Sequence, residues 1–128
     1  MKPIVLKGIV TKFKGDGRKL DYPTANLTVE TDLADGVYFG FAGLAEWTNR
    51  PALIFIGVPT TMGESLRRVE AHLLDIPDQD YYDLSLKLSV EHFYRPNQTF
   101  DSRDELVKVM NQDESAARQW FSSGSDRP

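Results

Sequence analysis

The stretch from Gly15 to Asn26 concentrates the residues best suited to binding a nucleotide. Gly15 and Gly17 bracket a single residue, and such a pair permits a turn with positive φ that brings backbone N–H groups close to an anion. Arg18 and Lys19 add positive charge at the same place. These residues indicate a loop over phosphate groups. A Gly-Asp-Gly sequence is also ordinary turn chemistry, and the glycine-lysine pattern of a P-loop is missing.

Thr24 and Asn26 close this stretch within a Pro-Thr-Ala-Asn segment. In an extended segment, residues two apart lie on the same side. Hydroxyl and amide oxygens suit Mg²⁺, which keeps most of its coordination as water and phosphate oxygens. The spacing therefore indicates a magnesium corner, although the same residues could simply begin a strand.

Glu70 and His72 also stand two residues apart, in a segment that alternates like a strand. Alternation places Val69 and Ala71 on one face and Glu70 and His72 on the other. A carboxylate beside an imidazole is suited to general-base chemistry. The alternative is an exposed polar face in which Glu70 balances a neighbouring arginine.

Composition excludes several other chemistries. The 128 residues are 41% hydrophobic and 27% charged, as expected for one globular domain. A net charge of −4 argues against a nucleic-acid partner. The absence of cysteine excludes disulfides, thiolate metal sites and cysteine nucleophiles, and two histidines are too few for a multi-histidine metal site. No apolar run suits a signal peptide or a membrane span, so we expect a cytoplasmic protein with no membrane partner.

Short strands with brief connections must position these residues. The clearest period-2 alternation spans residues 84–90, and glycines within 36–44 favour curvature of the sheet. This pattern, without an early helix, predicts a closed antiparallel barrel or sandwich. Residues 46–51 are expected to form a hairpin connection. The expected strands cover residues 4–13, 27–31, 36–44, 52–57, 67–75 and 84–90.

A helix is expected only near the C-terminus. Ser102 and Glu105 fit a capping box, and apolar residues recur at helical spacing from Leu106 to Phe121. We expect this helix, at about residues 102–121, to pack on the barrel as part of a single domain of residues 1–121. Residues 122–128 are expected to form a flexible tail.

Several short motifs occur in order along the chain. They are Gly15-x-Gly17-Arg18-x-Leu20, Pro23-Thr24-Ala25-Asn26-Leu27, Gly36-Val37-Tyr38, Ile56-Gly57 with Pro59, Val69-Glu70-x-His72, Asp80-x-Tyr82, Arg95-Pro96-x-x-x-Phe100-Asp101-Ser102, and a closing Asp113. Taken together and in this order, these motifs resemble those of the riboflavin kinase family of the bacterial and eukaryotic type. The resemblance runs from about Gly8 to about Phe121. It implies a six-stranded antiparallel Greek-key β-barrel with a C-terminal helix.

The resemblance implies an activity and residue roles. The family transfers the γ-phosphoryl group of ATP, with Mg²⁺, to the ribityl 5′-hydroxyl of riboflavin, giving FMN and ADP. Glu70 would be the general base, and Thr24 and Asn26 would hold the metal. A monomer is expected. The residues implied to bind ATP are Gly15, Gly17, Arg18, Leu73 and Asp75, and those implied to contact the flavin are Arg95, Gln98 and Phe100.

Three positions depart from the family pattern, and rival interpretations remain open. Asp21 and Asp83 stand where glycine is usual, and Asn97 replaces a frequent acidic residue. We expect no adenylyltransferase domain before the barrel. The main alternative is a non-catalytic flavin- or nucleotide-binding module. An oligonucleotide- or oligosaccharide-binding barrel is disfavoured by the acidic balance, and a purely structural interaction domain has no positive feature behind it.

Overall fold

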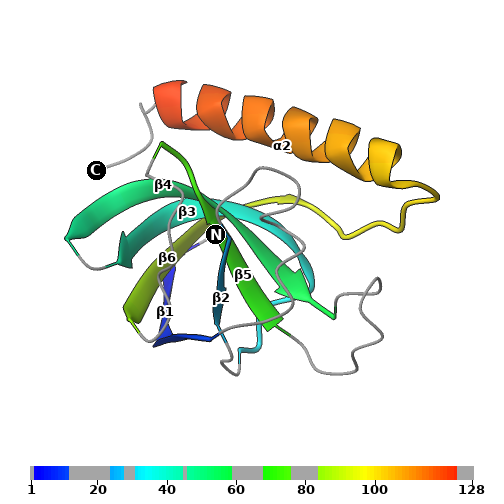
Figure 1. The fold of residues 1–128 in the computed structure, drawn as a ribbon. Coiled ribbons are helices and arrows are strands. Elements are labelled where there is room, and N and C mark those ends of the chain that lie inside the picture. Colours follow the sequence, from blue (N-terminus) through cyan, green and yellow to red (C-terminus); the bar gives the residue numbers. More distant parts are fainter. Residues whose placement is uncertain are drawn as a thin grey trace. The chain divides into compact units, whose positions relative to one another are not determined.

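Strands rich in β-branched and aromatic residues make up most of the first compact unit, Met1–Asn97, and a helix makes up most of the second, Gln98–Pro128 (Figure 1). The computed structural model describes residues 2–11, 24–27, 31–44, 46–58, 68–75 and 84–123. The expected antiparallel sheet with a C-terminal helix is confirmed. The elements are β1 (Ile4–Thr11), β2 (Thr24–Leu27), β3 (Gly36–Leu44), β4 (Trp47–Gly57), β5 (Arg68–Leu73), β6 (Ser85–Arg95) and α2 (Arg103–Ser123).

The strands close into a barrel in the order β1-β2-β5-β4-β3-β6, and each pair is antiparallel. β2 lies beside β5, and β6 pairs with both β1 and β3, so the chain crosses between strands that are not consecutive (Figure 1). Crossing connections bring residues far apart in sequence side by side. No helix among the described residues is long and apolar enough to cross a membrane.

Alternation along each strand fills the barrel interior with apolar side chains. On β6, Leu86, Leu88 and Val90 are buried while Ser85 and Lys87 are exposed, as the period-2 pattern predicts. Burial of such side chains away from water is the main source of stability. The interior cluster comprises Leu6, Val10, Ala25, Leu27, Tyr38, Ala42, Leu44, Ala52, Ile54, Ile56, Val69, Ala71, Leu73, Leu86, Leu88 and Val90.

Several strand boundaries differ from expectation. β5 ends at Leu73 rather than at residue 75, and β6 runs on to Arg95 rather than ending at residue 90. β2 begins at Thr24 rather than at Leu27, because the Thr24–Leu27 segment itself pairs with β5. β4 begins at Trp47, which pairs with Leu44 across a tight hairpin, so residues 46–51 are not a connection. Pro51 is tolerated within β4, and its carbonyl accepts a hydrogen bond of 2.9 Å from the Leu74 N–H.

Gly40 allows β3 and β6 to approach closely where the sheet bends. The β3–β6 register shifts between Phe39 and Gly40, which is the irregularity expected at a β-bulge. A Cβ atom at position 40 would collide with the backbone carbonyl oxygen of Ser89. The glycine therefore serves curvature and close strand contact, as the sequence favoured.

Replacing Gly40 by Ala is expected to lower the free energy of unfolding by about 1–3 kcal/mol, because the added methyl group overpacks a buried backbone contact. The melting temperature should fall by roughly 4–15 °C. Gly43→Ala on the same strand is the control, since a Cβ there would meet its nearest atom, the Trp47 oxygen, at 3.8 Å. Equal melting temperatures for both variants would contradict the explanation.

The helix α2 begins as its capping sequence predicts. The Glu105 N–H donates to Ser102 Oγ at 3.1 Å, and Glu105 Oε2 accepts a hydrogen bond of 3.4 Å from the Asp101 N–H. The helix continues to Ser123, two residues beyond the expected end, and residues 124–128 of the expected tail lie outside the described part. Its packing on the barrel stays a prediction. The buried residues Met110, Asp113 and Ala117 recur at spacings of three and four, on one face.

Candidate functional site

The strand register places the proposed base directly opposite a proposed metal ligand. The Cα of Asn26 on β2 pairs with that of Glu70 on β5 (Figure 1 shows the two strands side by side). The same row continues across β4, β3 and β6, and each residue in it is paired directly with the residue on the neighbouring strand. In order from β2 to β6, the row contains Asn26, Glu70, Phe55, Val37 and Arg95. The residues assigned to metal binding, to general-base catalysis and to flavin binding therefore lie in the same row of paired positions across the sheet.

A second row runs parallel to the first. On β2, β5 and β4, each of its residues is two positions along the strand from the residue of the first row. Thr24 pairs with His72, and His72 pairs with Leu53. Since neighbouring strands lie about 4.8 Å apart, positions 24, 26, 70 and 72 form a compact quadrilateral on one face. The row ends with Phe39 and His92 on β3 and β6.

Both rows lie on the face of the sheet that points away from the barrel interior. Ala25 and Ala71, which lie between the two rows, and Leu27 and Val69, which lie next to the first row, belong to the interior cluster. Side chains alternate along a strand, so the positions of Glu70 and His72 are on the outer face. The alternation inferred from the sequence for β5 is confirmed.

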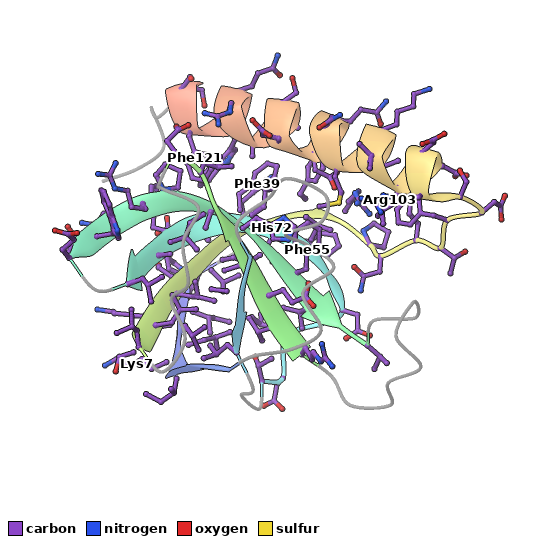
Figure 2. The ribbon with its side chains drawn as sticks, viewed as in Figure 1. Lys7, Phe39, Phe55, His72, Arg103 and Phe121 are labelled. Carbon is purple, nitrogen blue, oxygen red and sulfur yellow. The ribbon has the colours of Figure 1, made fainter. Side chains whose placement is uncertain are left out.

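His72 is buried although it lies on this outer face. Its exposed fraction is 3%, and the centroid of its ring lies 4.6 Å from that of the Phe55 ring. Figure 2 shows the two residues close together. Burial away from water lowers the pKa of His72 from 6.5 to about 4, so the imidazole is neutral at neutral pH. The alternative of an exposed polar face is therefore wrong for His72, while Glu70 beside it is half-buried.

The lowered pKa of His72 should make the fold less stable in acid. The unfolded chain binds a proton below about pH 6.5, whereas the native imidazole binds one only near pH 4, so stability falls as the pH falls through that window. Between pH 7.5 and 4.5 the loss from this residue should be about 2–3 kcal/mol. Denaturant unfolding of wild type and His72→Gln at both pH values measures it, and equal pH dependence in the two proteins would contradict the assignment.

Leu73 and Asp75, both implied to bind ATP, occupy different environments. Leu73 has an exposed fraction of 3% and belongs to the interior cluster, so its side chain is not on the face of Glu70. Asp75 is exposed in the turn after β5 and has a left-handed φ of 62°. Their role at a nucleotide stays a prediction, and the side chain of Asp75 is the more accessible of the two.

The residues implied to contact flavin begin at the end of β6. Arg95 pairs with Val37, and its Nη1 donates a hydrogen bond of 2.9 Å to the Pro96 carbonyl. Gln98 is exposed and Phe100 is half-buried; both belong to the second compact unit. The three lie within six residues of each other along the chain, and only Arg95 is part of the paired row.

Several expected site residues lie outside the described part of the chain. These are the loop residues Gly15, Gly17 and Arg18. Asp21 and Asp83, the two positions where glycine is usual in the family pattern, also lie outside it. For Thr24 and Asn26 the structure describes the backbone and its pairing only.

An apolar surface next to Glu70 was not predicted from the sequence. Leu53 and Phe55 on β4 pair with His72 and Glu70 and lie on the outer face. The signal was the unbroken apolar run of residues 52–56, which is typical of a strand covered on both faces. The aromatic surface continues on β3 and β6, where the rings of Phe39 (β3) and Tyr94 (β6) stack with their centroids 4.7 Å apart. A site at this position would combine the Glu70 carboxylate with an adjacent apolar surface.

Comparison with known proteins gives consistent matches. Residues 1–121 match the family described as Flavokinase, riboflavin kinase. The trifunctional protein RibF/MnmA of Mycoplasmoides gallisepticum is 34% identical over 124 residues, which is 94% of this chain and 19% of that protein. Riboflavin kinase of Pyricularia oryzae is 27% identical, covering 91% of this chain and 70% of that protein. The crystal structure of riboflavin kinase from Trypanosoma brucei has the same fold, with a TM-score of 0.73 at 22% identity over 95% of this chain and 82% of that one.

The lengths of these relatives differ widely. The chain spans about a fifth of the first, which is named as trifunctional, but more than two thirds of the fungal kinase. The matched region therefore corresponds to one part of the former and to most of the latter.

Proposed function

The chain belongs to the riboflavin kinase family, and from that premise we propose that it transfers the γ-phosphoryl group of ATP to the ribityl 5′-hydroxyl of riboflavin, forming FMN and ADP. The observation that carries the proposal is the family match over residues 1–121. The register that sets Glu70 opposite Asn26 supports it, because phosphoryl transfer depends on bringing a base, a metal site and the acceptor together.

Glu70 acts as the general base in this proposal. It accepts the proton of the 5′-hydroxyl as the oxygen attacks the γ-phosphorus, and the bond to the ADP oxygen breaks. Its neighbour on the same face, His72, is neutral at neutral pH. The imidazole therefore places no positive charge beside the carboxylate, and the strand register places an aromatic residue, Phe55, at the position paired with Glu70.

Thr24 and Asn26 hold Mg²⁺ in this proposal. The residue types fit the ion chemically, since threonine and asparagine offer neutral hard oxygens. Their backbone positions are two residues apart on β2 and lie beside β5, which carries Glu70. When bound, Mg²⁺ neutralises charge on the β- and γ-phosphates. The loop with Gly15, Gly17 and Arg18 is proposed to cover the same phosphates, and Asp75 to lie near the nucleoside.

The flavin is proposed to lie toward the end of β6. Arg95 ends the row that begins at Asn26 and passes through Glu70. Gln98 and Phe100 follow shortly after Arg95 and can add an amide and an aromatic face to a planar heterocycle. We also propose that the protein is a monomer in the cytoplasm. Its partners are riboflavin and ATP, and it binds no nucleic acid.

An endpoint assay tests the reaction directly. Purified protein is incubated with riboflavin, ATP and Mg²⁺, and the flavins are separated by chromatography. We expect FMN to form and to disappear when EDTA chelates the metal; restoring excess Mg²⁺ should restore it. Riboflavin binding without FMN formation, for any common nucleoside triphosphate and divalent metal, would favour the non-catalytic module instead.

A further inference from the structure

Asn97 ties the segment that follows β6 to the end of β4. Its Nδ2 donates a hydrogen bond of 2.9 Å to the backbone carbonyl of Ile56, a residue 41 positions earlier. The Asn97 residue itself is exposed, yet this hydrogen bond is partly buried. This long-range hydrogen bond therefore fixes the position of the backbone around Asn97.

Gly57 provides the space for this contact. A Cβ atom at position 57 would stand 2.5 Å from Asn97 Nδ2 and 3.5 Å from Asp35 Cγ. The φ of Gly57 is 152°, a conformation that residues with a Cβ rarely adopt. Any larger residue there would push the amide away from the Ile56 carbonyl.

The acceptor determines which side chain can make this contact. A backbone carbonyl needs a donor, and an amide has one whereas an ionised carboxylate has none. An aspartate at position 97 would face the Ile56 carbonyl oxygen without a proton to share, with the Asp35 carboxylate near the same point. The amide of Asn97 is thus what permits the hydrogen bond.

We propose that Asn97 is a positioning residue for flavin binding, which holds the Arg95–Phe100 segment in its binding conformation through the Ile56 carbonyl. This inference rests on the proposed function. Arg95 is fixed to β3 by pairing with Val37, and two residues later Asn97 is fixed to β4. Gln98 and Phe100 therefore follow directly after a fixed residue. This restriction reduces the conformational entropy that the segment loses when it contacts a ligand.

The test compares Asn97→Asp with Gln112→Glu, which makes the same amide-to-carboxylate change at an exposed position of α2. We expect Asn97→Asp to raise the KM for riboflavin about 3–10-fold, with kcat within about twofold and the KM for ATP unchanged. Gln112→Glu should leave all three at wild-type values. The melting temperature of Asn97→Asp should stay within a few degrees of wild type.

Gly57→Ala tests the same contact from the other side. It should raise the riboflavin KM as well, and the double variant Gly57→Ala with Asn97→Asp should be no worse than the more affected single variant, because both remove one interaction. An unchanged riboflavin KM in Asn97→Asp, with wild type forming FMN, would overturn the positioning role alone. A wild type that neither binds nor phosphorylates riboflavin would overturn the proposed function, and the positioning role with it.

Discussion

Replacing Glu70 by Gln is expected to lower kcat for FMN formation by about 10²–10⁴-fold, while riboflavin binding changes little. The amide keeps the shape of the carboxylate but cannot accept the proton of the ribityl hydroxyl. Glu70 is half-buried on β5, with Asn26 paired on one side and Phe55 on the other. Steady-state kinetics and quenching of flavin fluorescence measure the two quantities separately.

Glu91→Gln provides the matched control for this substitution. Glu91 is also half-buried on a strand, and its Oε2 accepts a hydrogen bond of 3.0 Å from Ser89 Oγ, so the change again removes a carboxylate from the barrel. It should retain near-wild-type kcat because Glu91 is not in the row that contains Glu70. If Glu70→Gln kept full activity, or if both variants lost it equally, the base would have to be another group.

Sequence pattern predicts β3 and most of β6. The bounds of β3, Gly36–Leu44, agree with the prediction although both faces of this strand are largely buried, and the alternation of residues 84–90 predicts β6, whose two faces differ. Apolar and polar side chains alternate where one face is buried, so local pattern reports the environment directly. β6 nevertheless runs on to Arg95, because pairing with β3 extends it past the end of the alternation.

The arrangement of the candidate site could not come from pattern alone. Alternation assigned Glu70 and His72 to one face, but which residues they oppose depends on the register of β2 and β5. These two strands pair although β3 and β4 lie between them in the sequence. A register shift of one residue would have placed Glu70 opposite Ala25 instead of Asn26. The burial of His72 is likewise a tertiary effect, since it depends on β4 residues such as Phe55. The family resemblance, rather than periodicity, predicted that these positions belong together.

Replacing Thr24 by Val is expected to lower kcat by on the order of 10²–10³-fold at a fixed Mg²⁺ concentration, because it removes one of the two side-chain oxygens proposed to hold the ion. Val keeps the β-branched shape, so β2 should still pair with β5. The concentration of Mg²⁺ that gives half-maximal activity should rise, and activity should recover partly at high Mg²⁺. A Mg²⁺ titration of the rate, with melting temperature as a check on folding, measures both effects.

Thr48→Val makes the same change at an exposed position of β4 and should leave the Mg²⁺ dependence as in wild type. Asn26→Leu provides the complementary test, since position 26 lies on the same strand face and opposite Glu70. If Thr24 and Asn26 hold one ion, the loss in the double variant should be smaller than the product of the two single losses, because removing either ligand already weakens the shared site. Independent, multiplicative losses with no change in Mg²⁺ requirement would mean that the two residues act on separate parts of the substrate, and that the metal is held elsewhere.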